Sequence, residues 1–190
     1  EESIAAFGDV MATAPPDIRV GVTIGAAFGC PIEGEVPLDR LLQVVEACVA
    51  HDPHEIGLAD TIGVAVPRDV TERVGAIRRA FPDVPVRLHL HNTRNTGIAN
   101  AWAGLEAGVR ALDASLGGVG GCPFAPRATG NIATEDLLYM LDRSGVKTNM
   151  SMDAAIDTAL WLEKQLGKTV PGQLMKAGGF PDPQTGEAAA

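Results

Sequence analysis

The chain has 190 residues, 46% of them apolar, and a formal net charge of −9. This length and composition indicate one folded domain rather than a disordered chain, and the negative charge argues against a surface that binds nucleic acid. No apolar run reaches the length of a membrane span. The three cysteines lie too far apart in the sequence to indicate a disulfide framework. We therefore expect a cytoplasmic protein that contacts neither nucleic acid nor a membrane.

The first half of the chain predicts two strands, each followed by a helix. The run Ile18–Ala27 is rich in β-branched residues, which is typical of a strand. Leucines and valines at helical spacing predict a helix over Pro37–His51. A short apolar run, His54–Leu58, predicts the second strand and is closed by Ala59, Asp60 and Thr61. A second helix is expected over Pro67–Phe81, because prolines stand at its start and just after its end.

The second half repeats this order and ends in two helices. Val86–His91 is the third expected strand, followed by an alanine-rich helix over Thr96–Ala107. Ala111–Leu116 is the fourth strand, and a glycine cluster follows it. Two amphipathic helices are expected over Thr134–Ser144 and Met152–Leu166, the second capped by Ser151. The segment from Gly178 onward is polar and is expected to be a disordered tail.

Strands that alternate with single helices predict an α/β fold with a parallel sheet and right-handed crossovers. Two architectures fit this order: an open, doubly wound sheet, or half of an eight-stranded barrel. In both, the carboxyl ends of the strands carry the functional site. The candidate residues follow those ends: Cys30, Asp60, His89 with His91, and Cys122.

The stretch RLHLHNT at 87–93 places two of the four histidines on alternate positions of one strand. Because side chains alternate across a strand, His89 and His91 are expected to share a face. Two imidazoles on one wall can bind a divalent metal when oxygen ligands complete its shell, although a short H-x-H motif also occurs where histidines only make structural hydrogen bonds. Asp60, at the end of the neighbouring strand, favours the metal site. Asn92 falls on the opposite face and is expected in a turn or helix entry.

The stretch from Ser115 to Asp136, SLGGVGGCPFAPRATGNIATED, is the most unusual part of the chain. Its glycines allow tight turns and close approach to a ligand, and Cys122 ends the glycine-rich segment. No nucleotide-binding glycine motif is present in the right place. A small buried hydrophobe is the structural alternative for Cys122. Locally, Glu135 is typical of a helix first turn and Asn131 of a turn.

Together these stretches resemble the 3-hydroxy-3-methylglutaryl-CoA lyases of the DRE-TIM metallolyase family. The matching runs are GAAFGCPIEGEV at 25–36, EIGLADTIGVAVP at 55–67, LHLHNTRNTGIAN at 88–100 and SLGGVGGCPFAPRATGNIATEDLLYML at 115–141. The resemblance implies a partial TIM (β/α)8 barrel. Residues 1–177 would supply approximately strands five to eight with their helices, and residues 1–14 would end the fourth helix. Residues 178–190 would form the tail.

The resemblance also assigns roles to six residues. His89, His91 and Asn131 are similar to the residues that hold the divalent metal, and Cys122, Asp60 and Glu135 to the catalytic residues. The metal implied is Mg²⁺ or Mn²⁺. The family's first strand carries an Arg-Asp pair that this chain lacks, and Asn92 stands where an aspartate is common. The second difference suggests a related acyl-CoA as the substrate.

The activity implied is cleavage of 3-hydroxy-3-methylglutaryl-CoA to acetyl-CoA and acetoacetate. A sister aldolase, another acyl-CoA lyase or a condensing enzyme on the same barrel is the first alternative. A fragment that is catalytically inert and serves only in structure or interaction is the second. Half a parallel barrel would expose two unpaired strand edges, so a homodimer is also expected.

Overall fold

The computed structural model describes residues 2–121 and 130–181. Its elements in chain order are α1 (Glu2–Thr13), β1 (Val22–Ile24), β2 (Gly29–Cys30), β3 (Gly34–Glu35), α2 (Leu38–Val49), β4 (Ile56–Asp60), α3 (Pro67–Ala80), β5 (Val86–Leu90), α4 (Gly97–Glu106), β6 (Ala111–Asp113), the 3₁₀ turn η1 (Leu116–Gly118), α5 (Thr134–Arg143), α6 (Met152–Leu166) and α7 (Leu174–Ala177). The α/β fold and the alternation of the four sheet strands with helices are those predicted from the sequence, whereas β2, β3 and α7 were not predicted.

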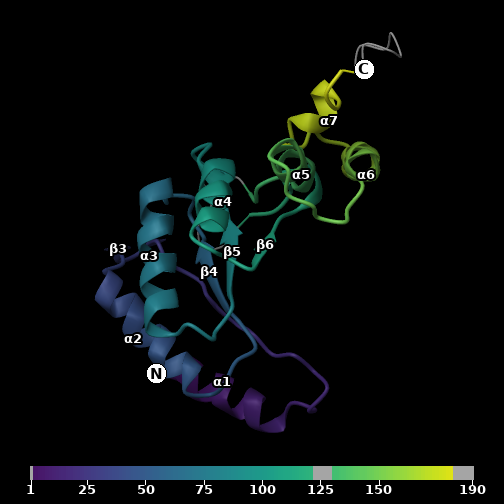
Figure 1. The fold of residues 1–190 in the computed structure, drawn as a ribbon. Helices are drawn as coiled ribbons and strands as arrows, with labels where there is room; N and C mark the ends of the chain where they lie inside the picture. Colours follow the sequence, from purple (N-terminus) through teal and green to yellow (C-terminus); the bar gives the residue numbers. More distant parts are fainter. Residues whose placement is uncertain (1, 122–129, 182–190) are drawn as a thin grey trace.

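Four parallel strands form the central sheet in the order β1-β4-β5-β6. All five residues of β4 are buried, as expected for an inner strand. Along β5 the burial alternates, so that Val86, Leu88 and Leu90 enter the core and Arg87 and His89 lie on the opposite face, half-buried. Figure 1 shows α3 and α4 lying together over the sheet, with α5, α6 and α7 grouped beyond β6.

The helices that cover the sheet form because each has one apolar stripe and a defined start. In α2 the buried residues are Leu41, Val45 and Cys48, at a spacing that places them on one helix face. In α3 Pro67 occupies the first turn, and the Asp69 carboxylate accepts a hydrogen bond of 3.0 Å from the backbone N–H of Val66. These stripes and the buried side chains of the strands form the main core.

The C-terminal helices form a smaller unit around η1. α6 begins at Ser151, whose Oγ accepts a hydrogen bond of 3.2 Å from the backbone N–H of Ala154, and ends at Gly167 in the left-handed conformation. Ala159 of α6, Val170 of the connecting segment and Met175 of α7 form a second apolar cluster.

The structure corrects several predicted boundaries. The first strand, expected over Ile18–Ala27, is only Val22–Ile24, and a two-stranded hairpin of β2 and β3 occupies what was expected to be a turn. The second strand starts and ends two residues later than predicted, so it includes Asp60. The fourth strand ends at Asp113, three residues earlier than predicted, and the last of those three, Leu116, begins η1. The expected helix α6 is confirmed residue for residue.

The parallel sheet is confirmed, and both of its outer strands have a single neighbour. β1 pairs only with β4, and β6 only with β5, within the part of the chain that the structure describes. Across those same residues, none of the helices is long and apolar enough to span a lipid bilayer.

Candidate functional site

The two histidines of the H-x-H motif face one another at the carboxyl end of β5. The Nε2 atoms of His89 and His91 are 3.2 Å apart, and their ring centroids are separated by 5.1 Å. Their shared wall is the direct result of strand alternation and was predicted from the sequence. His91 is 4% exposed as a residue, whereas the side chain of His89 is 32% exposed. The pair therefore has one buried ring and one accessible ring.

An ionic network contacts the ring of His89 at Nδ1, the nitrogen that does not face His91. Its Nδ1 lies 2.5 Å from Oδ1 of Asp113, and Oδ2 of Asp113 forms an ion pair with Nη1 of Arg87. Nε of Arg87 donates to Oε1 of Glu55 at 2.7 Å, and its Nη2 donates to Oγ1 of Thr23 at 2.9 Å. The network therefore joins residues on or directly beside all four strands of the sheet.

This network sets the charge states around the pair. Burial lowers the pKa of His91, and the neighbouring His89 lowers it further, against the opposing effects of the Thr61 backbone and Asp113. Burial raises the pKa of Asp113, but its hydrogen bond to His89 and the charges of His89 and Arg87 outweigh this, so that the pKa of Asp113 lies below its usual value. We conclude that His91 favours the neutral form and Asp113 the anionic form.

Asn131 lies directly beside His91. The two residues form an isolated antiparallel bridge, and Nδ2 of Asn131 donates a hydrogen bond of 2.9 Å to the carbonyl of Val119. Oδ1 of Asn131 is buried and has no hydrogen-bond partner among the described residues. A buried amide oxygen without a partner is unfavourable unless a ligand satisfies it.

Asp60 takes a different position from the one expected. The sheet register pairs Ala59 with His89 and Asp60 with Leu90, so Asp60 lies on the opposite face from His89. Its carboxylate accepts hydrogen bonds from the backbone N–H groups of Val64 (2.9 Å) and Ala65 (3.1 Å). Asp60 therefore does not share the face of His89, and the catalytic role that the family resemblance assigns to it stays a prediction. Burial raises the pKa of Asp60, although these two backbone bonds oppose that effect.

Glu135 is completely buried in the first turn of α5. Its Oε2 accepts a hydrogen bond of 3.0 Å from the backbone N–H of Gly117, and Oε1 has no partner among the described residues. Burial raises the pKa of Glu135, and the backbone hydrogen bonds that it accepts partly counteract this. Its observed contact is with the 3₁₀ turn where the glycine segment begins, rather than with either histidine.

Cys122, the remaining predicted catalytic residue, lies outside the described residues. Among residues 2–121 and 130–181, no group of three or more His, Cys, Asp or Glu side chains could hold a metal ion. The carboxylate of Asp113 contacts Nδ1 of His89, and the oxygen donor beside His91 is the amide of Asn131.

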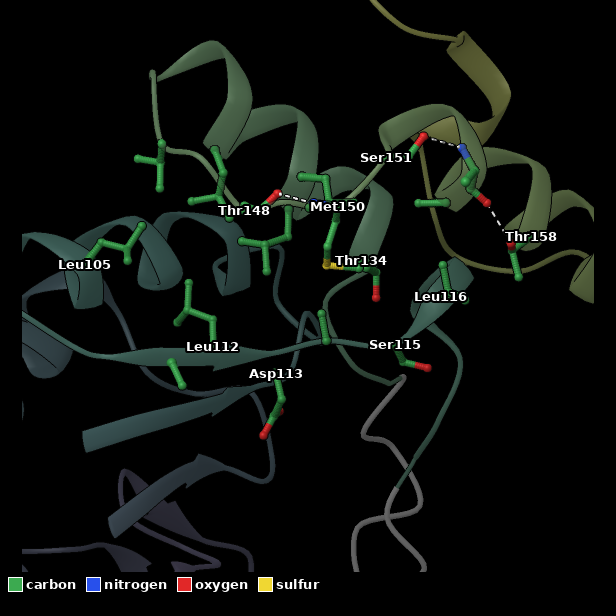
Figure 2. Close-up of a pocket in the computed structure, with 18 of the residues that line it drawn as sticks. Leu105, Leu112, Asp113, Ser115, Leu116, Thr134, Thr148, Met150, Ser151 and Thr158 are labelled. Atoms are coloured by element: carbon green, nitrogen blue, oxygen red, sulfur yellow. Dashed lines mark hydrogen bonds between the residues drawn. The ribbon is translucent and has the colours of Figure 1, made fainter. Parts of the chain in front are cut away.

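Two cavities flank this region. A groove of about 1080 Å³ runs beside β6 and is lined mainly by apolar side chains of α4, α5 and α6. Figure 2 shows Leu112 and Asp113 pointing to opposite sides of β6, with the leucine on the side of the groove. A polar cavity of about 790 Å³ lies next to the site, and Asn92, Asn131, Gln173 and Lys176 are among the residues that line it.

The sequence reading missed the residues behind the histidine pair. Asp113 stands 24 residues beyond His89, in a strand of only three residues, and belongs to no motif. Asp113 could have been found only by aligning the third and fourth strands as parallel neighbours, because their register places Asp113 directly beside His89. Asn92 occupies the expected helix entry, where its Oδ1 accepts a hydrogen bond from the N–H of Gly97.

Comparison with known proteins places this site in a wider group. (R)-citramalyl-CoA lyase of Chloroflexus aurantiacus is 51% identical over 161 residues, which cover 85% of this chain and 51% of that protein. Hydroxymethylglutaryl-CoA lyase YngG of Bacillus subtilis is 39% identical over 150 residues, or 79% of this chain and 50% of that protein. The chain thus spans about half the length of these curated relatives.

A solved structure shows the same arrangement of elements. An HMG-CoA lyase from "Acenitobacter baumannii", in complex with coenzyme A and 3-methylmalate, superposes with a TM-score of 0.88 at 39% identity. The match covers 96% of this chain and 61% of that one. The HMGL-like family pattern matches residues 11–160, which is more than half of the chain. The chain therefore belongs to the HMGL-like family, together with relatives that are CoA lyases.

Proposed function

We propose that the intact protein is a divalent-metal-dependent lyase that cleaves a carbon–carbon bond of a 3-hydroxyacyl-CoA. The observation that carries the proposal is the convergence of His89 Nε2 and His91 Nε2 at 3.2 Å. The similarity to CoA lyases from two bacteria supports the reaction class. The structural match to a lyase complexed with coenzyme A supports an acyl-CoA as substrate.

The residues present fit a divalent cation. Two ligand atoms that each lie about 2.1 Å from one cation, at roughly a right angle, are about 3 Å apart, and the two Nε2 atoms match that separation. The partnerless Oδ1 of Asn131 provides an oxygen donor of the kind that Mg²⁺ and Mn²⁺ accept. His89, His91 and Asn131 would hold the ion, and water and substrate oxygens would occupy other ligand positions.

The proposed reaction breaks the C2–C3 bond of the substrate. The hydroxyl on C3 loses its proton and becomes a ketone, while the bonding electron pair passes to C2 and gives the enolate of acetyl-CoA, which then takes up a proton. A divalent cation, when bound, would lower the pKa of that hydroxyl. Asp60 and Cys122 are proposed for the two proton transfers because the family resemblance assigns them catalytic roles. For Asp60 this role requires its carboxylate to leave the backbone N–H groups of Val64 and Ala65 and to reach the substrate.

Two substrates fit this chemistry and differ by one methylene between the carbinol and the free carboxylate. Citramalyl-CoA would give acetyl-CoA and pyruvate, and 3-hydroxy-3-methylglutaryl-CoA would give acetyl-CoA and acetoacetate. We propose citramalyl-CoA first, because the relative with 51% identity carries that name. The polar cavity beside Asn131, with the cationic Lys176 in its wall, suits the carboxylate of either substrate.

We further propose that the described sheet is half of a TIM barrel. Its two outer strands, β1 and β6, each have one free edge among the described residues. The apolar groove beside β6 offers a surface on which further strands and helices would be buried. The Arg-Asp strand typical of the resembling family would belong to the other half.

An assay of the intact protein with both substrates tests the function. We expect Mn²⁺-dependent release of acetyl-CoA, with pyruvate as the co-product from citramalyl-CoA. The double variant H89A/H91A should lose at least 100-fold in rate, an order-of-magnitude expectation for removing metal ligands. H54A, which removes an exposed histidine, is the matched control and should retain activity. Equal rates for the double variant and the wild type would contradict the proposal.

A further inference from the structure

Asp113 uses both of its carboxylate oxygens, and only one contact leads to the site. Oδ1 meets Nδ1 of His89 and Oδ2 meets Arg87. Because both oxygens of the carboxylate are bound, the group cannot rotate freely about its Cβ–Cγ bond, and the orientation of Oδ1 toward His89 is fixed. Arg87 is itself fixed, because it also donates to Glu55 and Thr23.

The contact determines which nitrogen of His89 is available to a ligand. A neutral imidazole carries one N–H, and an anionic carboxylate beside Nδ1 favours the tautomer in which Nδ1 bears that proton. The lone pair then lies on Nε2, the atom that faces His91 at 3.2 Å. Histidines that bind metals commonly donate their second nitrogen to a carboxylate, which orients the ring and raises its basicity.

We propose that Asp113 is a positioning residue that aims Nε2 of His89 at the cation, with Arg87 fixing Asp113 in turn. The inference rests on the proposed function, because it assigns a role toward the ion that His89 and His91 would bind. It adds a residue outside the six assigned from the family resemblance.

The network supplies its own control. Glu55 contacts the same Arg87 as Asp113, at 2.7 Å, and its side chain is buried to a similar degree (27% exposed against 37%). Glu55 makes no contact with His89 among the interactions of the described residues. E55Q and D113N therefore each remove one negative charge beside Arg87, but only D113N changes the group that contacts His89.

The test is Mn²⁺ titration of the intact protein, followed by electron paramagnetic resonance. We expect D113N to bind Mn²⁺ roughly 10- to 100-fold more weakly than the wild type, and E55Q to bind within about twofold of it. Pulsed measurements of bound Mn²⁺ should show weaker imidazole-nitrogen modulation in D113N. Thermal unfolding of both variants separates a loss of stability from a loss of ligand orientation.

D113E is the second variant, for the case in which D113N does not fold. It keeps the negative charge beside Arg87, while its longer side chain displaces the ring of His89. We expect D113E to bind more weakly than the wild type. Wild-type affinity in both D113N and D113E, or equal weakening in E55Q and D113N, would overturn the inference. H91A distinguishes the two failures: if H91A weakens binding while the Asp113 variants do not, only this inference fails. If H91A also binds like the wild type, the proposed metal site fails with it.

Discussion

Two unprotonated imidazole nitrogens that face each other at 3.2 Å repel one another unless a proton or a cation lies between them. Burial lowers the pKa of His91, which disfavours a proton on that ring. Asp113 is anionic beside the other ring and favours a proton on Nδ1 rather than on Nε2 of His89. The local electrostatics therefore favour a cation as the shared partner of the two Nε2 atoms.

The buried carboxylate of Glu135 leads to a prediction about how the stability of the protein depends on pH. Its pKa is raised in the folded protein, chiefly by burial, so the folded state binds its proton more tightly than the unfolded state does. The associated stability is present at low pH and is lost as the pH rises through the folded-state pKa. We expect urea unfolding of E135Q, compared with the wild type at a series of pH values, to lose less stability as the pH rises from acid to neutral.

E135Q keeps a side-chain oxygen that can accept from Gly117, so its fold should be retained. D136N is the control, since Asp136 lies next to it and accepts from the N–H groups of Gln173 and Leu174 at the start of α7. A stability profile for E135Q that runs parallel to the wild-type profile at every pH would contradict this reading of Glu135.

The histidine pair was predictable because strand alternation is a local rule. His89 and His91 are two residues apart, and no information beyond the strand itself was needed. The partner of His89 was not predictable from a motif, because Asp113 meets it only through sheet pairing. The strand that carries Asp60 ends two residues later than predicted, and the register sets Asp60 beside Leu90 rather than beside His89, which the sequence alone did not indicate.

The strand β5 and the helix α4 pack closely against each other. A Cβ atom built on Gly104 would lie 2.4 Å from Cδ1 of Leu88, which is completely buried. A glycine is therefore required at this helix position for the helix to lie against the strand that carries the histidines. The alanine-rich composition of α4 serves the same close packing.

This contact makes G104A destabilising although alanine favours helices by about 1 kcal/mol over glycine. Overpacking of a filled core costs about 1–3 kcal/mol, so the net effect should be a loss in the free energy of unfolding. In the L88A background the obstructing methyl group is absent, and G104A should stabilise. A double-mutant cycle by urea denaturation measures this coupling.

G75A is the matched glycine-to-alanine control, because among the described residues its Cβ would meet only the flexible end of Arg79, at 3.2 Å. We expect G75A to be neutral or stabilising. Equal effects of G104A with and without Leu88 would show that the packing described here does not limit the distance between strand and helix.

Elements with strong periodicity were predicted well, and short ones were not. α6 agrees with its expected bounds because Ser151 and Gly167 mark both ends. The β2–β3 hairpin has two residues in each strand, too few to show any alternation. α7 has four residues and starts without a side-chain cap, so nothing local marks its start.

Among the described residues, the outer strands β1 and β6 each have one unpaired edge, and an apolar groove lies next to β6. The groove beside β6 measures about 1080 Å³, and exposed strand edges are templates for pairing with other chains. Exposed apolar side chains continue onto α6, where Trp161 is 58% exposed. We expect these surfaces to contact further protein, either the other half of the proposed barrel or a second copy of this chain.

A protein of these 190 residues alone should therefore self-associate. We expect sedimentation velocity to show an average mass that rises with concentration. The wall of the groove is mainly apolar and carries Arg110 as its cationic residue among the described ones, so the association should tolerate moderate salt. A monomer at every concentration would argue that the edges and the groove need no partner. Co-expression with the other half of the proposed barrel should suppress the association.

We expect His89 and His91 to hold one cation between their Nε2 atoms. Crystals of the intact protein grown with Mn²⁺ would show this cation. An anomalous difference map should show one peak within bonding distance of both Nε2 atoms, with Oδ1 of Asn131 also turned to it. If crystals grown at a saturating Mn²⁺ concentration and neutral pH gave a map without a peak between the two rings, the two histidines would not share a cation.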